Sequence, residues 1–365
     1  MNRGAIAEID LSALRNNLQI IKRIVGNRYV IAVVKADAYG HGSVGISKRL
    51  LEEGVSCLAV AYTGEARLLR ESGIEADIII LFDCTSIEDF FDYKLTPVIY
   101  DINTALEFSR EAEKRRMKIA VHLKVDTGMG RIGFNPGNAV SDAVRISEME
   151  GIELKGLMSH FSEADLPDGK FSVRQLELFK MIKKDIQEKL GYSLMSHMAN
   201  SGAVLSFGDS LLDAVRPGIM LYGYSPCMDD SGLKPLMKIK TGILSIKNLP
   251  AGSTVSYGRT FITKRESRIA VIPVGYADGY SRRFSNNAEV IVRGKRVPVA
   301  GRICMDLTMI DVTGVEGVSR GDEVVLLGGQ GVEVITAREL ASRIDTIPYD
   351  ILTSLGGMAK KEYIH

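Results

Sequence analysis

YVIAVV at residues 29–34 begins a series of short apolar runs, most of which are followed by a stretch of helical character. The later runs are SCLAVA (56–61), DIIILF (77–82), PVIY (97–100), IAVHLKV (119–125), LKGLMS (154–159), MSHMA (195–199) and DAVRP (213–217). The stretches between them, such as DLSALRNNLQIIKRIV (10–25), place apolar residues at helical spacing. Eight strands that alternate with helices predict a TIM-type (β/α)8 barrel rather than an open doubly wound sheet.

After about residue 232 the sequence pattern changes from alternating strands and helices to mainly strands. Its β-rich runs, broken by Gly, Pro, Asn and Asp, are KIKTGILSIKNL (238–249), RIAVIPVGYA (268–277), EVIVRGKRVPVAG (289–301), CMDLTMIDVTG (304–314) and DEVVLLGG (322–329). Only VITARELASRI (334–344) has helical spacing. A chain of 365 residues has room for about two domains. We therefore predict an α/β chain with a barrel over 1–231 and a mainly β domain over 232–365, divided within Ser225–Pro235.

The composition excludes several classes of protein. Forty-six basic and 45 acidic residues leave a formal charge of +1, without the basic surplus of a nucleic-acid binder. No apolar run approaches the ~20 residues that span a bilayer, and the first residues lack the apolar core of a signal peptide. The four cysteines are widely spaced, which predicts reduced thiols and no metal site. We expect a cytoplasmic protein with no nucleic-acid or membrane partner.

Lys35 directly follows the first apolar run, in the stretch VVKADAYGHG (33–42). A residue at the end of a barrel strand lies at the C-terminal face, where barrel enzymes build their active sites. A lysine partly desolvated there has a lowered pKa and can form a Schiff base. A lysine that simply leaves the strand for solvent is the ordinary alternative. Tyr39 and the glycines Gly40 and Gly42 favour a ligand site, because glycine lets the backbone approach a ligand closely.

Other polar residues fall at the same ends of the predicted strands. Lys124 lies in the fifth run between His122 and Asp126, and His160 follows the sixth. Each has a structural alternative: Lys124 and Asp126 as an ion pair, and His160 as a buried core histidine. That all of them lie at one rim by chance is much less probable than any single alternative.

The last two runs are followed by polar residues and glycine. Asn200 and Ser201 follow the seventh run, and Arg216-Pro217-Gly218-Ile219 ends and follows the eighth. Barrel enzymes commonly bind phosphate at this position. The Ser201 hydroxyl and the backbone amides of Gly218 and Ile219 suit such a site.

Loops of the second domain carry tyrosines and adaptable groups. Tyr257 and Tyr276 lie in tyrosine-glycine loops, Met305 and Asp306 follow Cys304, and Tyr349 follows a proline. Taken singly, loop tyrosines are more often packing residues than acids or bases.

The motifs AVVKADAYGHG (32–42), HLKVDTGMGRIGF (122–134), VRPGIMLYG (215–223), VSYGRTF (255–261), VGYADGY (274–280) and GRICMDLTMIDVT (301–313) occur in this order. In sequence, order and spacing they resemble the alanine racemases over the whole chain. That family consists of pyridoxal 5'-phosphate enzymes with a barrel and a β domain. The resemblance implies the interconversion of L-alanine and D-alanine, with D-alanine supplied for cell-wall peptidoglycan.

The resemblance also implies a role for each site residue. Lys35 forms the covalent link to the cofactor, and Lys35 and Tyr257 are the two catalytic bases. The residues implied to hold the cofactor are Lys35, Tyr39, His160, Asn200, Ser201, Arg216, Gly218, Ile219 and Tyr349. The residues implied to bind or support the substrate are Arg131, Met305, Lys124, Tyr276 and Asp306. The family lysine that matches Lys124 is often carbamylated and braces the arginine that matches Arg131, so Lys124 is a candidate for this modification.

Racemisation itself requires two bases, because a proton leaves one face of the α-carbon and another arrives on the opposite face. The cofactor stabilises the carbanion, and the protein supplies orientation and the bases. In the family, Arg216 faces the pyridine nitrogen and His160 links it to Tyr257. Because guanidinium stays protonated, Arg216 leaves that nitrogen unprotonated and makes transamination rare.

Several alternatives remain open at this point. A racemase of serine, or of larger amino acids such as lysine or ornithine, would share the mechanism. A fold-related basic amino-acid decarboxylase needs no second base, and a cofactor-homeostasis protein with a barrel alone needs no second domain. The resemblance further implies a homodimer with shared active sites, in which Tyr257 of one chain serves Lys35 of the other.

Overall fold

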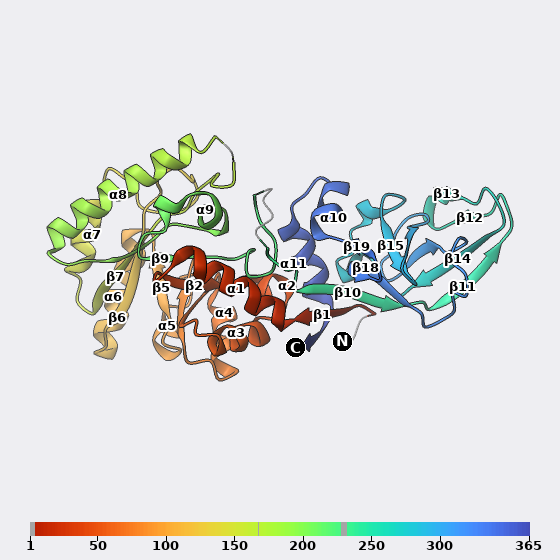
Figure 1. Cartoon of the computed structure of the whole chain (residues 1–365). Coiled ribbons are helices and arrows are strands. Elements are labelled where there is room, and N and C mark those ends of the chain that lie inside the picture. Colours follow the sequence, from red (N-terminus) through yellow and green to blue (C-terminus); the bar gives the residue numbers. More distant parts are fainter. Residues whose placement is uncertain (1–3, 167, 228–231) are drawn as a thin grey trace. The chain divides into compact units, whose positions relative to one another are not determined.

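The computed structural model describes residues 4–166, 168–227 and 232–365 (Figure 1). The chain forms two compact units, and both combine segments that are distant in the sequence. The linker predicted within Ser225–Pro235 contains residues 228–231, which lie outside the described residues.

The first unit, here the barrel unit, contains Leu14–Lys35 and Val44–Lys234. The second, here the β unit, contains Met1–Ala13, Ala36–Ser43 and Pro235–His365. The segment directly after Lys35 therefore belongs to the β unit. The predicted division into a barrel domain over 1–231 and a mainly β domain over 232–365 stays a prediction.

The barrel unit is a closed ring of parallel strands, as the sequence predicts. Its strands are β2 (Tyr29–Val33), β3 (Cys57–Val60), β4 (Asp77–Ile80), β5 (Thr96–Ile99), β6 (Ile119–Lys124), β7 (Ile152–Met158), β8 (Met195–His197) and β9 (Ala214–Val215). The ring closes through short pairings, because β9 pairs with β2 at Tyr29↔Ala214 and with β8 at His197↔Ala214. Fully buried side chains such as Val98, Val121 and Leu157 fix the strands in the core.

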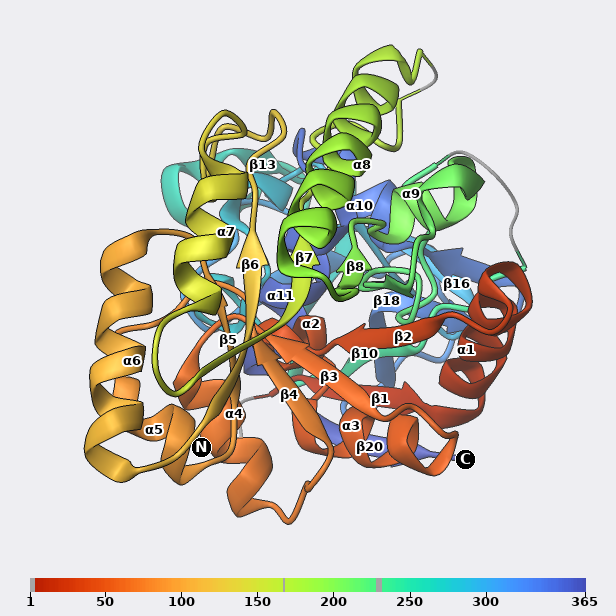
Figure 2. The same ribbon diagram turned by 90° about the vertical axis from the view of Figure 1, so that its left-hand side faces the viewer.

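Helices surround these strands (Figure 2). They are α1 (Leu11–Val25), α3 (Ser43–Glu52), α4 (Thr63–Glu71), α5 (Ile87–Asp92), α6 (Ile102–Arg115), α7 (Ala139–Ser147), α8 (Lys170–Leu190) and α9 (Ser201–Ser206). The first turn of α1 has the predicted acceptor, because Asp10 Oδ1 accepts from the backbone N–H of Ser12 at 2.8 Å and of Ala13 at 3.1 Å. No helix of the described residues is long and apolar enough to cross a membrane.

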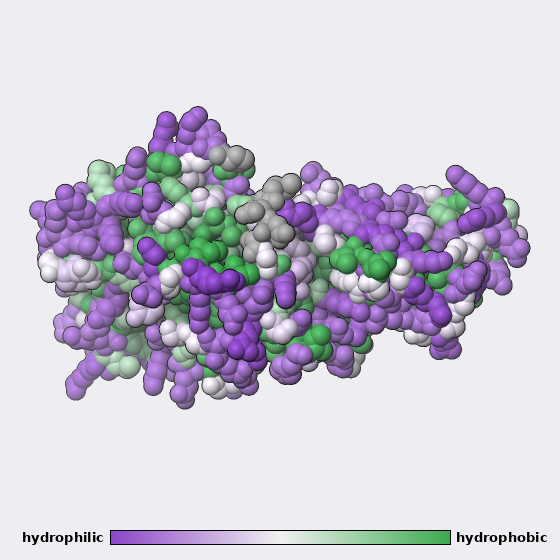
Figure 3. All heavy atoms as spheres, in the orientation of Figure 1, coloured by the Kyte–Doolittle hydropathy of each residue, from purple (hydrophilic) through white to green (hydrophobic). Residues whose placement is uncertain are grey.

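The β unit contains the strands predicted after residue 232. They are β10 (Met237–Gly242), β11 (Ser245–Leu249), β12 (Thr254–Val255), β13 (Phe261–Ile262), β14 (Ser267–Ile272), β15 (Glu289–Val292), β16 (Lys295–Pro298), β17 (Thr308–Asp311), β18 (Glu323–Gln330) and β19 (Glu333–Ile335). The largest sheet runs β16-β15-β18-β10-β1-β20, so it also takes in both ends of the chain, β1 (Ile6–Asp10) and β20 (Lys360–Ile364). Figure 3 shows hydrophilic side chains over most of the visible surface, with apolar side chains in separate patches.

Two helices follow the last β-rich run. The helix α10 (Ala337–Arg343) is the predicted one, and α11 (Pro348–Met358) shows that the expectation of a single helix was wrong. Pro348 stands at the start of α11, where its missing N–H costs nothing. The pair Gly356-Gly357 near its end has low helix propensity, so the sequence pattern did not predict a helix here.

Candidate active site

Lys35 lies at the C-terminal end of β2, two residues after the strand ends. Burial lowers the pKa of its amine, and the nearby Arg131 guanidinium lowers it further, whereas Glu65 raises it. Its Nζ lies 5.1 Å from the centre of the Phe82 ring. Partial desolvation of this lysine agrees with the expectation from the sequence and favours its nucleophilic, unprotonated form.

Arg216 directly follows β9 and is 4% exposed. It lies at the barrel mouth, by which we mean the C-terminal ends of the barrel strands, and its guanidinium makes several hydrogen bonds there. Its Nη1 donates to His197 Nδ1 at 2.7 Å and to the His197 carbonyl at 2.8 Å. Its Nη2 donates to the carbonyls of Ser159 at 2.7 Å and Met198 at 3.2 Å, and lies 3.3 Å from His160 Nδ1. These acceptors fix the guanidinium plane, and no hydrogen bond of the described residues uses Nε.

Arg216 also fixes the tautomers of two buried histidines. Because a guanidinium only donates, His197 must accept at Nδ1 and carry its proton on Nε2. That proton points to His122 Nδ1, 2.8 Å away. Burial, together with the Arg216 charge, lowers the pKa of both rings, for His122 to about 4. Both rings are therefore neutral near pH 7, and a chain of oriented hydrogen bonds runs from His122 to Arg216.

His160 follows β7 and contacts the same guanidinium. Burial and the positive charges of Arg216 and Lys124 hold its pKa well below the ordinary value, so it is a neutral imidazole. The structure thus brings His160 to Arg216, as predicted. Its predicted link to Tyr257 would join the two units and remains a prediction.

The segments after β8 and β9 meet at Ser201. Its Oγ accepts from the backbone N–H of Gly218 at 2.9 Å and of Met220 at 3.4 Å. Asn200 caps α9, because its side chain accepts from the Ala203 N–H at 3.0 Å. A hydroxyl and backbone amides thus gather after the last two strands, where the sequence predicted a phosphate site.

Lys124 ends β6 and is 2% exposed. Burial, together with the Arg216 and Arg131 charges, lowers its pKa to about 7, whereas Asp126 opposes this effect. Asp126 itself accepts from the backbone N–H groups of Gly128, Met129, Gly130 and Arg131 at 2.8–3.1 Å. Asp126 thus folds the loop that presents Arg131, which disfavours the structural alternative of a Lys124–Asp126 ion pair.

The turn after Lys35 is strained. In α2 (Lys35–Gly40) the four residues from Ala36 to Tyr39 have positive φ angles of 52–54°, so they form a left-handed turn although none of the four is glycine. Each such residue costs about 1–2 kcal/mol, and strain of this kind clusters at functional sites. The Tyr39 ring packs 5.8 Å from the ring of Tyr349, and burial raises the pKa of Tyr39.

A hollow of about 460 Å³ in the β unit is lined by Ser256, Tyr257, Cys304, Met305, Asp306, Leu307 and Met309. Tyr257 is 68% exposed and Met305 54% exposed. The neighbouring Tyr276 loop is fixed to this wall, because the Tyr276 N–H donates to the Cys304 carbonyl at 3.1 Å. The predicted Tyr257, Met305 and Asp306 therefore surround one cavity, with Tyr276 on the adjacent loop.

Residues 9–226 match the alanine racemase N-terminal domain, and residues 236–363 match the alanine racemase C-terminal domain. The chain belongs to the alanine racemase family. The predicted family, the predicted fold class and the isomerase class are confirmed.

Relatives in the alanine racemase family match over nearly their full length. The alanine racemase of Thermodesulfovibrio yellowstonii is 48% identical and covers 100% of this chain and 99% of its own. An alanine racemase structure from Clostridium difficile 630 has a TM-score of 0.94 and 35% identity, covering 100% of this chain and 96% of that one. A structure from Bartonella henselae, with covalently bound pyridoxal phosphate, has a TM-score of 0.89 and 31% identity, with 99% of both chains covered.

Three residues of this alanine racemase family member were not predicted from the sequence as parts of the site. Phe82 ends the apolar run DIIILF and looks like a core residue. His122 was singled out only as a polar strand residue, and His197 lies inside a predicted strand. Only the pairing of the barrel strands reveals that these histidines meet.

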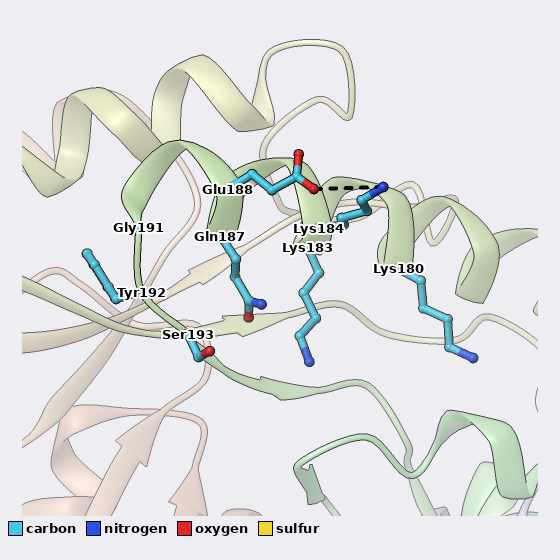
Figure 4. A pocket seen from close by; sticks show the side chains of 8 residues that line it. All are labelled: Lys180, Lys183, Lys184, Gln187, Glu188, Gly191, Tyr192 and Ser193. Atoms are coloured by element: carbon cyan, nitrogen blue, oxygen red, sulfur yellow. Dashed lines mark ion pairs between the residues drawn. The ribbon is translucent and has the colours of Figure 1, made fainter.

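A second hollow, of about 540 Å³, lies along α8 (Figure 4). Two of the three lysines that line it have acidic partners: Lys184 lies 3.7 Å from Glu188, and Lys183 lies 3.1 Å from Asp213. It contains none of the residues that the alanine racemase resemblance singles out.

Proposed function

We propose that this chain interconverts L-alanine and D-alanine with pyridoxal 5'-phosphate as cofactor and with Lys35 and Tyr257 as the two bases. Its family membership gives the reaction class. The observation that carries the assignment of residues is the group of Lys35, Lys124, Arg131 and Arg216 at the C-terminal ends of the barrel strands. Such a group suits a ligand with several negative charges.

The residues of the barrel mouth fit this cofactor. Lys35 offers a desolvated amine that can attack an aldehyde. Arg216 offers Nε to a ring nitrogen, and its other nitrogens are held by protein acceptors. The Ser201 hydroxyl and the Ile219 N–H would bind the phosphate, together with the Gly218 N–H, which donates to Ser201 Oγ in this structure. When bound, the cofactor withdraws electrons from the α-carbon of the amino acid.

The two bases act on opposite faces of the α-carbon. We assign the D-face to Lys35 and the L-face to Tyr257, as the family resemblance implies. Glu65 raises the pKa of Lys35 against the effect of burial, so the amine can hold a proton between removal and return. Arg131 and the backbone amide of Met305 bind the substrate carboxylate, while Tyr39 and Tyr349 border the phosphate.

Arg216 limits side reactions. Its hydrogen bonds to carbonyls and to a neutral histidine stabilise the charged guanidinium, which donates a hydrogen bond but keeps its proton. A ring nitrogen that receives only a hydrogen bond accepts less electron density than a protonated one. Return of the proton to the α-carbon is therefore favoured over its transfer to the cofactor.

Carbamylation of Lys124 is part of the proposal. With a pKa of about 7, a large fraction of this amine is unprotonated at neutral pH and can add carbon dioxide. Its neighbours Arg216, Arg131 and Lys35 are all cations. A carbamate would replace one positive charge by a negative one at the centre of this group and would brace Arg131.

The dimer with shared sites is supported by the exposure of the β-unit cavity. Tyr257, Met305 and Leu307 are apolar or aromatic groups that are 68%, 54% and 37% exposed. Apolar side chains gathered around one cavity are typical of an interface. A second copy that covers this cavity with its barrel mouth gives two identical sites.

The substrate is tested by incubating the purified protein with a panel of L-amino acids and measuring the D-enantiomers. We expect the highest kcat/KM for alanine, consistent with supply of D-alanine for peptidoglycan. A preference of about tenfold or more for serine, lysine or ornithine would assign the chain to one of those racemases. Borohydride reduction followed by peptide mapping tests the cofactor link and should label Lys35.

The shared site is tested by mixing two variants, Lys35→Ala and Tyr257→Phe, each nearly inactive alone. In a mixed dimer one site carries both lesions and the other is intact, so activity should recover to ~25% of the wild-type value. A mass-tagged partner verifies that subunits exchange. Exchange without recovery means that both bases come from one chain.

A further inference from the structure

One aromatic ring in the barrel mouth faces three cations. The Phe82 ring centre lies 5.1 Å from Lys35 Nζ, 5.7 Å from Lys124 Nζ and 5.4 Å from Arg131 Cζ. Lys35, Phe82 and Lys124 follow or end β2, β4 and β6, which are alternate strands of the barrel. Alternate strands contribute to the same layer of side chains in such a barrel, so this contact is built into the fold.

The acidic groups nearby are engaged elsewhere. Asp126 accepts four backbone N–H groups of its own loop, and Glu65 accepts from the backbone N–H of Ala61 at 2.7 Å and Tyr62 at 3.2 Å. The other charged groups near Lys35 are Arg131 and Lys124, and the lowered pKa of His160 keeps that ring neutral. While Lys124 is an unmodified amine, the negative face of the Phe82 ring is therefore the counterpart for these cations.

Arg131 depends on this ring for its orientation. Its backbone is fixed by Asp126 at 3.0 Å, but its side chain is exposed. Among the described residues, its guanidinium makes a cation–π contact with the Phe82 ring. A flat ring restricts a long side chain that otherwise samples many rotamers.

We propose that Phe82 is a positioning residue, whose ring holds Lys35 and Arg131 together at the barrel mouth. For Lys35, the ring stabilises the ammonium form and opposes the effect of burial. For Arg131, it keeps the guanidinium where a substrate carboxylate arrives; this second part rests on the proposed function, and the first part does not.

The first experiment uses the cofactor-free protein. Limiting acetic anhydride is reacted across a pH range, and the label on Lys35 is measured by mass spectrometry to give the apparent pKa of its amine. Phe82→Leu keeps an apolar side chain and removes the ring face, so it should lower this pKa by about 0.4 to 1.5 units. Phe82→Tyr keeps the face and should leave the pKa unchanged. An unchanged pKa in Phe82→Leu overturns the proposal for Lys35.

A ring-fluorinated phenylalanine at position 82 provides the matched control. It preserves the shape of the ring and weakens the negative charge of its face, so folding should be unaffected. The pKa of Lys35 should fall in the same direction as in Phe82→Leu. If the fluorinated protein behaves as wild type, the ring acts by shape alone and the electrostatic proposal is wrong.

The second experiment uses the holoenzyme. Phe82→Leu should raise the KM for alanine and the inhibition constant of propionate, which shares only the carboxylate, by about 2- to 30-fold. The kcat should change less. A lower kcat at unchanged KM and unchanged propionate inhibition would indicate a merely structural role. If the wild-type holoenzyme does not racemise alanine, the proposed function fails, while the Lys35 titration still decides the role of Phe82.

Discussion

The barrel unit and the β unit hold their candidate site residues in opposite ways. Arg216 in the barrel is 4% exposed and donates to several fixed acceptors, whereas Tyr257 in the β unit is 68% exposed. The barrel half is organised by its own hydrogen bonds before any ligand arrives. The β-unit cavity instead presents its side chains to solvent, so its residues acquire a defined environment only when something covers them. Changes in the barrel should therefore alter both stability and chemistry, and changes at Tyr257 should alter chemistry alone.

Lys35→Ala should have the largest effect on activity. Loss of the amine removes both the covalent link and one base, so racemisation should fall by about 10⁴-fold or more. The cofactor-free protein should unfold at the same or a higher denaturant concentration, because a desolvated cation is removed. Racemase assays and denaturant unfolding measure the two quantities. Substantial remaining activity would show that another lysine carries the cofactor.

Tyr257→Phe should rank next, with a loss of about 10²- to 10⁴-fold in racemisation. Because the side chain is exposed, the unfolding midpoint should not change. In deuterium oxide the variant should still exchange the α-proton of D-alanine slowly, and hardly that of L-alanine. Equal exchange from both enantiomers contradicts the assignment of the two bases to opposite faces.

Gly156→Ala should destabilise the barrel unit, although this residue contacts no ligand in the proposed site. A Cβ at this position would lie 2.4 Å from the His122 ring, which is held by His197. We expect a loss of about 1–3 kcal/mol in the free energy of unfolding. Gly64→Ala, where a Cβ meets open space, is the control and should be neutral or slightly stabilising. Combining Gly156→Ala with His122→Ala should cost less than the sum of the two, and strict additivity would mean that the two residues do not interact.

Lys124→Met should have the smallest effect, and its sign depends on pH. The native pKa of about 7 lies below the ordinary value of 10.5, so the folded state binds fewer protons than the unfolded state between these values. Stability conferred by this site therefore rises with pH across that window and is lowest below about pH 7. The variant should stabilise the cofactor-free protein most at the acidic end, in bicarbonate-free buffer. Unfolding curves with the same pH slope for both proteins would refute the low pKa.

The barrel could be predicted because its strands are continuous apolar runs, and Lys35 because it follows one of them. Phe82 could not be predicted as a site residue, because an aromatic residue after an apolar run is indistinguishable from core until the barrel closes. The contact of His122 with His197 depends on strands that are 75 residues apart in the sequence. The position of β1 beside β10 and β20 depends on partners at the other end of the chain. Pattern within a short window carries no information about such pairings.

The left-handed turn that follows Lys35 has a consequence for the order of events during synthesis. The Tyr363 hydroxyl donates to the carbonyls of His41 and Gly42, and Lys361 lies 2.9 Å from Asp37. The Leu352 carbonyl also lies where a Cβ on Gly40 would be, so only glycine lets α11 approach the turn. The strained turn at residues 36–39 is thus held by residues that lie more than 300 positions further along the chain. The backbone that follows Lys35 can therefore take its final form during synthesis only after these distant residues have been made.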